Sequence, residues 1–298
     1  MTQAIVRTAA GLFTLADTPA APHLAPHLAL ERPLVLATDL DGTFLGGNEA
    51  ERAALYRWLH TVREQQPARL TLIFVTGRDL PFVRELITQQ VAGVPLPRPD
   101  YVIGDVGTTI AGGPAIEPLP ELERDIAARW RRGAPSDEQA RAALRALLAN
   151  EPGLREQDTP FRHRLSYWYE PARLSPGTLG KIRAAGYDGL LSADTFLDVL
   201  PRGVSKGPTL RHLIAHLRLA PDQVLVAGDT LNDLSLFETG LRGVAVGNAE
   251  PALLSRLRAR PLPRTYRSPH PGAAGILDAV CHHGFAPRPT RAATEARD

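Results

Sequence analysis

Residues 34–43 read LVLATDLDGT. The first half, Leu34–Thr38, is a nearly continuous apolar run, which predicts a strand buried on both faces of a sheet. Asp39 and Asp41 follow where this strand ends, and ligands bind at the carboxyl ends of strands in open α/β sheets. Two carboxylates held this close repel each other unless a cation or unequal pKa values relieve them. The pattern favours a chemical site over a solvated turn, in which Asp and Gly are also ordinary residues.

Apolar runs of the same kind recur along the chain and alternate with segments of helical composition. The further runs are Leu70–Val75, Tyr101–Ile103, Val224–Ala227 and Gly243–Val246. The helical segments are Ala50–Gln65, Leu80–Gln90, Lys206–Leu217 and Leu231–Thr239. Strands that alternate with helices are typical of a parallel sheet covered on both faces, so we expect a doubly wound, Rossmann-like α/β core.

The alternation stops between about residues 113 and 201. Helical composition is found at 119–131, 136–150 and 176–185, and strand-like runs at 162–170, 189–192 and 196–200. Helices and strands mixed without a recurring crossover predict an inserted α+β domain, which we call the cap. The core is then discontinuous, 31–112 and 202–285, with flexible segments expected at 1–30 and 286–298.

Composition narrows the class of protein. The chain has 298 residues, 44% of them apolar, which is enough for one large and one smaller domain. Its net charge of +2, without a concentrated basic tract, gives nucleic acid or an acidic membrane little to hold. Cys281 is the only cysteine, so no intrachain disulfide can form. Residues 9–16 faintly resemble a signal peptide, but Asp17 ends the run, and we expect a soluble cytoplasmic protein.

Two further motifs offer groups that suit an anion. Thr76 and Gly77 follow a strand, and a hydroxyl and backbone N–H groups beside a helix start can hold phosphate oxygens. A turn with a helix cap explains this pair equally well when it is taken alone. Lys206 begins a helical segment, where the helix dipole favours acidic residues, so its position indicates a neighbouring anion. A solvated surface lysine is the alternative.

A fourth motif places three oxygen-bearing side chains within five residues. Asp229, Asn232 and Asp233 follow the apolar run 224–227 and therefore lie at the same sheet edge as the first motif. Magnesium prefers oxygen ligands, usually one or two carboxylates with water and substrate phosphate. A helix N-cap would account for one of these residues, but not for the group.

In this order, the four motifs resemble those of the haloacid dehalogenase superfamily of phosphohydrolases, over about residues 33–285. An insertion between the second and third motifs resembles the mixed α/β cap of its sugar-phosphatase branch. The strings 99–108, 165–169 and 198–201 are similar to those of sucrose-phosphate phosphatases and of the related mannosylfructose-phosphate and glucosylglycerol-phosphate phosphatases. The fourth motif departs from the pattern, since Thr230 and Leu231 replace the Ser-Gly common in sucrose-phosphate phosphatases.

The resemblance implies a magnesium-dependent hydrolysis of a small sugar phosphate. Asp39 would attack phosphorus and form an aspartyl-phosphate, while Asp41 would protonate the leaving oxygen and then activate water. The implied magnesium ligands are the Asp39 carboxylate, the Asp41 carbonyl and Asp229, supported by Asp233. The implied phosphate-binding groups are Thr76, the Gly77 N–H, Lys206 and Asn232.

Candidate sugar contacts lie on the cap strand and are Arg162, Arg164, Tyr167 and Tyr169. Alternation sends only every second side chain toward the site, so the tyrosines could instead pack in the cap core. Trp168 points away from both tyrosines, and one of the two sets should be core.

Two other functions share these motifs. A phosphomutase-like transferase would use the same aspartyl-phosphate but return the phosphate to a sugar. A catalytically silent protein would bind a sugar phosphate as the partner of a glycosyltransferase. The complete set of reactive residues argues against the silent protein.

Overall fold

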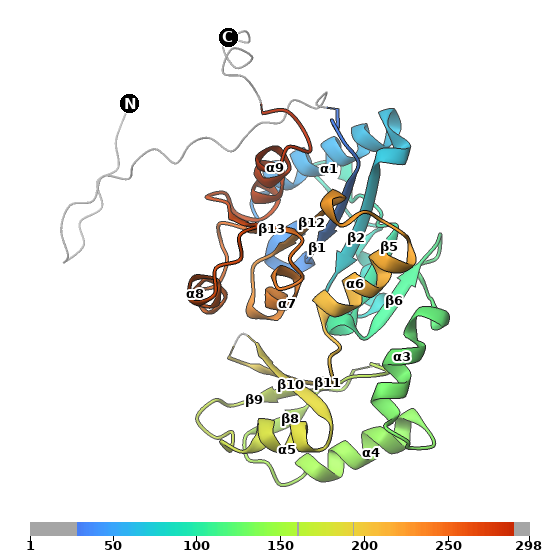
Figure 1. Cartoon of the computed structure of the whole chain (residues 1–298), viewed down its shortest axis with the longest axis vertical. Helices are drawn as coiled ribbons and strands as arrows, with labels where there is room; N and C mark the ends of the chain where they lie inside the picture. The colour runs from blue at the N-terminus through green and yellow to red at the C-terminus, as the bar shows by residue number, and fades with distance from the viewer. Residues whose placement is uncertain (1–28, 160, 193, 289–298) are drawn as a thin grey trace, which may run out of the picture.

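The computed structural model describes residues 29–159, 161–192 and 194–288. These residues form a large body built on one sheet and a smaller body below it, and the two face each other across a cavity (Figure 1). The expected terminal extensions lie almost entirely outside the described residues. Leu30, which falls within the first expected extension, is buried in the core. Within the described part of the chain, no helix is long and apolar enough to cross a membrane.

The larger sheet has the strand order β14-β13-β12-β1-β2-β5-β6-β7. Its strands are β1 (Leu34–Thr38), β2 (Leu70–Val75), β5 (Tyr101–Gly104), β6 (Thr109–Gly112), β7 (Glu117–Pro118), β12 (Val224–Gly228), β13 (Arg242–Ala245) and β14 (Thr265–Arg267). The six strands from β14 to β5 pair in parallel; five of them were predicted, and β14 was not. The last two, β6 and β7, are antiparallel and were not predicted. The predicted runs 101–103 and 224–227 each extend one residue further in the structure, and the run 243–246 is shifted by one residue to Arg242–Ala245.

Helices cover both faces of this sheet, so β1 is buried on both of its faces. Leu34 and Leu36 belong to one apolar cluster, while Val35 and Ala37 belong to the other. The first cluster includes side chains of α1 (Glu49–Gln65), α2 (Leu80–Leu86) and α9 (Gly272–His282). The second includes side chains of α3 (Pro120–Arg131), α6 (Lys206–His216), α7 (Leu234–Phe237) and α8 (Pro251–Ala259). The doubly wound core is thereby confirmed.

Two predicted helices are shorter than expected. The helix predicted over 80–90 ends at Leu86, because Gln90–Val91 (β3) pairs with Val94–Pro95 (β4) across a tight turn. The helix predicted over 231–239 begins as a single 3₁₀ turn, Leu231–Asp233, before α7.

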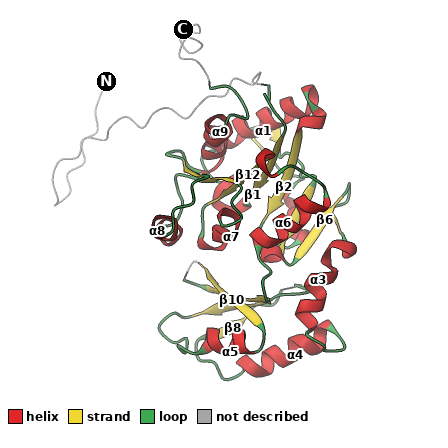
Figure 2. Cartoon of the chain, viewed as in Figure 1, coloured by secondary structure: helices red, strands yellow, loops and turns green. Residues whose placement is uncertain are grey.

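The cap is an antiparallel sheet with helices on one face (Figure 2). Its order is β10 (Tyr187–Ser192), β11 (Phe196–Pro201), β9 (Leu165–Tyr169) and β8 (Leu154–Glu156), with α4 (Asp137–Leu148) and α5 (Thr178–Ala184) against it. Helix α3 joins the two bodies, since Leu122 and Ile126 pack in the large core and Trp130 packs in the cap core. Figure 1 shows that the face of the cap sheet opposite α4 and α5 is turned toward the large body.

Candidate active site

The sheet topology brings three of the four motifs to one edge. Strand β1 lies between β12 and β2, with Thr38 opposite Ala227 on one side and Phe74 on the other. Asp39, Asp229 and Thr76 follow these strands directly, and the Asp39 N–H donates to the Ala227 carbonyl at 2.9 Å. The remaining motif, the third, supplies Lys206, which enters from the first turn of α6.

Lys206 is the centre of a buried cluster of carboxylates. Its Nζ atom lies 2.7 Å from Oδ1 of Asp39, 2.6 Å from Oδ1 of Asp233 and 2.7 Å from Oδ1 of Asn232. Carboxylate oxygens of Asp39, Asp229 and Asp233 all lie within 4.8 Å of one another. The Lys206 side chain is 0% exposed, so it is not the surface lysine that the sequence also allowed.

Burial and mutual repulsion shift the proton equilibria of this cluster. Burial raises the pKa of Asp39 well above its usual range, with smaller contributions from Asp233 and Asp229, against the lowering effect of Lys206. Burial also raises the pKa of Asp229 to about 7. Burial alone would lower the pKa of Lys206, but the charges of Asp233 and Asp39 outweigh it and the pKa is raised. One ammonium thus faces three carboxylates, which leaves negative charge uncompensated.

This surplus of negative oxygen is a donor set that fits magnesium. Thr43 Oγ1 donates to Asp229 Oδ1 at 2.7 Å and fixes the orientation of that carboxylate. Gly42 has φ +76°, and a Cβ there would lie 2.1 Å from Asp229 Oδ2. The close approach of the Asp229 carboxylate to the first motif therefore requires glycine at residue 42.

Asp233 differs from the other two carboxylates because both of its oxygens have protein partners. Oδ1 accepts from Lys206, and Oδ2 accepts the backbone N–H groups of Asp229 and Thr230, each at 3.0 Å. Asp233 thereby closes the loop that carries Asp229 and holds it against Lys206.

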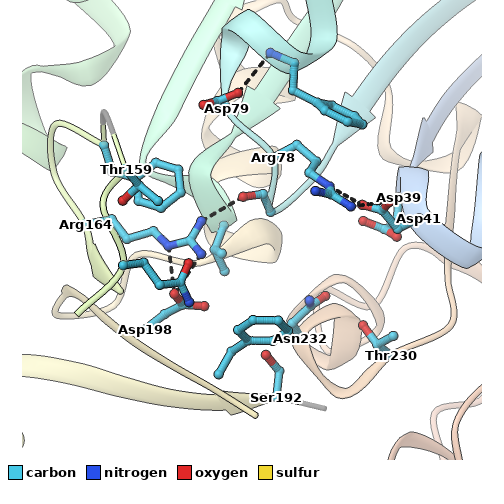
Figure 3. A pocket seen from close by; sticks show the side chains of 16 residues that line it. Asp39, Asp41, Arg78, Asp79, Thr159, Arg164, Ser192, Asp198, Thr230 and Asn232 are labelled. Atoms are coloured by element: carbon cyan, nitrogen blue, oxygen red, sulfur yellow. Dashed lines mark hydrogen bonds and ion pairs between the residues drawn. The ribbon is translucent and has the colours of Figure 1, made fainter. Parts of the chain in front are cut away.

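Asp41 is bound by an arginine, Arg78, to which the sequence pattern assigns no role. Nε and Nη2 of Arg78 lie 2.9 Å from Oδ2 and Oδ1 of Asp41, a two-pronged ion pair with both side chains about half exposed. Figure 3 shows this pair beside Asp39. Such a fork fixes a carboxylate in orientation as well as in charge.

A cavity of about 520 Å³ opens over Asp39 and Asp41. The core also contributes Gly77, Arg78 and Asn232 to its walls, and the cap contributes Phe161, Arg164 and Asp198 among others (Figure 3). Thr76 is buried beneath it, and its hydroxyl oxygen accepts the Arg78 N–H at 3.1 Å. A substrate in this cavity would contact the carboxylate cluster at one end and cap side chains at the other.

The four cap candidates do not lie together, since Arg162 and Arg164 precede β9 and only the two tyrosines lie on it. Arg164 lines the cavity, as does Asp198, its partner on β11. Tyr167 and Tyr169 point to the opposite face, where they pack in the cap core with 5% and 8% of their surface exposed. The expectation that they contact substrate in this cavity is corrected, because β9 turns that face toward α4 and α5. Tyr169 lines a second cavity instead.

Arg162 also lies outside the lining of the main cavity. Its Nη2 atom lies 2.7 Å from Oε2 of Glu123, a buried carboxylate on α3 whose other oxygen accepts the Ile110 N–H at 2.8 Å. Arg162 therefore joins the cap to α3 and β6.

A strained loop beneath the cavity was not anticipated. Asp105, Val106 and Gly107 have φ values of +52°, +59° and +102°, which is unusual for an aspartate and rare for a β-branched residue. The Asp105 N–H donates to the Arg78 carbonyl at 3.0 Å and the Val106 N–H to the Thr76 carbonyl at 3.1 Å. On the other side, Thr209 of α6 donates to the Gly107 carbonyl at 2.7 Å. The loop thus spaces the second motif from the helix of Lys206.

Known proteins are similar to this chain in sequence and in fold. A family model described as sucrose-6F-phosphate phosphohydrolase matches residues 32–284. A glucosylglycerol-phosphate synthase from Pseudomonas anguilliseptica is 40% identical over 253 residues, which make up 85% of this chain but 31% of that protein. A mannosylfructose-phosphate phosphatase from Agrobacterium fabrum is 34% identical over 268 residues, or 86% of this chain and 100% of that protein.

Among solved structures, the sucrose-phosphatase from Synechocystis sp. PCC6803 in complex with sucrose and phosphate has a TM-score of 0.72 to this chain. It is 29% identical over 85% of this chain and 99% of that one. The family match covers the core, the cap and all four motifs. The chain therefore belongs to the sucrose-6F-phosphate phosphohydrolase family, within the haloacid dehalogenase superfamily of phosphatases.

Proposed function

We propose that this protein hydrolyses the phosphate monoester of a small sugar or disaccharide through an aspartyl-phosphate on Asp39, with magnesium as cofactor. One observation carries the proposal. The Asp39 carboxylate belongs both to the cluster around Lys206 and to the wall of the cavity shared by core and cap. A nucleophile at that position meets substrate on one side and fixed charge on the other.

In the first step, a carboxylate oxygen of Asp39 forms a bond to phosphorus while the bond from phosphorus to the sugar oxygen breaks. Asp41 gives its proton to that leaving oxygen. In the second step, Asp41 takes a proton from water as the water oxygen bonds to phosphorus, and the bond from phosphorus to the Asp39 oxygen breaks, which releases phosphate and the free Asp39 carboxylate. Asp41 must part from Arg78 to move these protons, because the ion pair engages both of its oxygens.

The proposed magnesium ligands are the carboxylates of Asp39 and Asp229 and the Asp41 backbone carbonyl. Bound there, magnesium would offset the repulsion between an anionic nucleophile and an anionic ester. Lys206, Asn232, Thr76 and the Gly77 N–H would hold the non-bridging phosphate oxygens, with Lys206 at the same time fixing Asp39.

For the substrate, we propose a phosphorylated product of glycosyl transfer. The matched relatives include a glucosylglycerol-phosphate synthase and a mannosylfructose-phosphate phosphatase. The matched residues make up 31% of the length of the synthase. A glycosyltransferase would supply such an ester in the same compartment. We place that compartment in the cytoplasm, which agrees with a single buried cysteine, Cys281.

The proposal is tested by measuring phosphate release from sucrose-6-phosphate, mannosylfructose-phosphate, glucosylglycerol-phosphate and hexose phosphates. Each is assayed with magnesium and with EDTA. We expect magnesium-dependent release of phosphate when only one sugar phosphate is present, without a second sugar as acceptor. One of the glycosyl esters should be preferred over the hexose phosphates. Transfer of phosphate to a second sugar without release would indicate a phosphomutase. Binding of an ester without turnover would indicate the silent protein.

A further inference from the structure

One cap side chain reaches past the cavity and binds the backbone of the core. Arg164, just before β9, donates from Nη1 to the carbonyl oxygen of Gly77 at 2.7 Å. Gly77 lies between Thr76 and Arg78, in the segment proposed to hold phosphate. This hydrogen bond therefore connects the cap directly to the second motif.

The guanidinium of Arg164 is held in place by other cap residues. Its Nε and Nη2 atoms lie 2.8 and 2.7 Å from Oδ1 of Asp198, which also accepts the hydroxyl of Ser166 at 2.6 Å. The side chains of Arg164 and Asp198 are 8% and 4% exposed, and the Phe161 ring lies 4.1 Å from the guanidinium carbon. In Figure 3 the dashed lines from Arg164 run to Asp198 and toward the core. A planar fork anchored on two sides has little freedom to turn toward a sugar.

The carbonyl that Arg164 holds belongs to the peptide that joins Gly77 to Arg78. The N–H of this peptide donates to the Thr76 hydroxyl oxygen at 3.1 Å, and the Arg78 side chain holds Asp41. The orientation of this single peptide thus bears on the Thr76 hydroxyl and the Asp41 carboxylate together.

We propose that Arg164 is a positioning residue for phosphate and not a sugar contact. With the cap over the site, it orients the peptide between Gly77 and Arg78 so that the second motif presents its phosphate donors. Phosphate affinity is thereby coupled to the position of the cap. This inference rests on the proposed function, because it assigns phosphate to the second motif.

The test separates an effect of Arg164 on phosphate binding from an effect on sugar binding. Affinity for inorganic phosphate and orthovanadate is measured by calorimetry with magnesium present. Values of kcat and KM are measured for p-nitrophenyl phosphate, which has no sugar, and for the best sugar phosphate. The variants are Arg164→Met, Arg164→Lys and Ser166→Ala. The matched control is Arg155→Met, because Arg155 also lies over a cap ring, Trp168 at 4.0 Å, but outside the cavity lining.

For Arg164→Met we expect phosphate affinity and kcat/KM for p-nitrophenyl phosphate both to fall by about tenfold, the usual size of a coupling between sites. Lysine lacks the fork, so Arg164→Lys should lose nearly as much. Ser166→Ala should lose less, and Arg155→Met should match the wild type.

The inference is overturned if Arg164→Met raises only KM for the sugar phosphate and leaves phosphate affinity and p-nitrophenyl phosphate turnover unchanged. If Arg164→Met does not fold, unchanged phosphate affinity in both Arg164→Lys and Ser166→Ala overturns it equally. If the wild type hydrolyses no ester, the proposed function is refuted. If phosphate affinity nevertheless falls in Arg164→Met, the positioning role of Arg164 still stands.

Discussion

The ammonium nitrogen of Lys206 lies 2.7 Å from Oδ1 of Asp39, although the two residues are 167 positions apart in the chain. The same nitrogen lies 2.6 Å from Asp233, which in turn holds the loop of Asp229 through two backbone N–H groups. One lysine thus aligns the proposed nucleophile with a proposed magnesium ligand. Loss of any member of this cluster should affect the others.

Replacing Lys206 by Met should destabilise the fold and stop turnover. Two buried carboxylates, Asp39 and Asp233, would lose their common cation, and breaking a buried ion pair from one side costs about 3–5 kcal/mol. Urea unfolding of the metal-free protein measures this loss. In the double variant Lys206→Met/Asp233→Asn, part of the loss should be recovered because one stranded charge is gone. Additive effects of the two substitutions would contradict the coupling.

Replacing Gly42 by Ala should impair magnesium binding. The new Cβ would lie 2.1 Å from Asp229 Oδ2, so this carboxylate must move. A displacement of about 1 Å at a site of chemistry lowers activity on the order of 10²-fold. Titration of activity with magnesium measures the effect. Gly113→Ala is the matched control, since Gly113 has φ +74° and a Cβ added there would meet nothing within 4 Å. Equal losses in both variants would show that backbone strain alone is responsible.

Magnesium should stabilise the folded protein as well as activate it. The carboxylates of Asp39 and Asp229 carry raised pKa values, and a cation that binds only the folded state adds to its stability. The melting temperature should therefore rise with magnesium and fall back with EDTA. Asp229→Asn should abolish the increment. An increment that survives in Asp229→Asn would place the cation elsewhere.

Asp105 should make stability depend on pH in the acidic range. Burial raises its pKa to about 6 from 3.8, so the folded state holds this proton more tightly than the unfolded state. The favourable contribution is complete below pH 3.8 and is lost as pH rises through about 6. A shift of two units corresponds to about 3 kcal/mol. Urea unfolding of the metal-free protein between pH 4 and 7 should show a smaller fall in Asp105→Asn than in the wild type. Parallel curves would contradict the assignment.

The core of the site was predictable because its residues follow strands directly. Once Leu34–Thr38, Leu70–Val75 and Val224–Gly228 form adjacent parallel strands, Asp39, Thr76 and Asp229 must meet at one edge. This needs only the apolar pattern and chain order. The five core strands predicted from that pattern agree with the structure to within one residue at each end, whereas the cap strand predicted over 162–170 spans only Leu165–Tyr169.

Features that depend on tertiary partners were not predictable. Alternation on β9 places Tyr167 and Trp168 on opposite faces, but the packing of α4 and α5 decides which face is core. The pairing of Arg78 with Asp41 joins two loops whose distance no local pattern encodes. Val106 at φ +59° contradicts the preference of its own side chain, and its loop is held by hydrogen bonds to the second motif on one side and from Thr209 of α6 on the other.

The central claim is that Asp39 is the nucleophile, and phosphate release by Asp39→Asn tests it most directly. The assay uses magnesium and the best substrate of the wild type, with circular dichroism to verify the fold. We predict a folded protein that releases no measurable phosphate, because an amide cannot form the acyl phosphate. A folded Asp39→Asn that still turns over the substrate at a rate near that of the wild type would contradict the account.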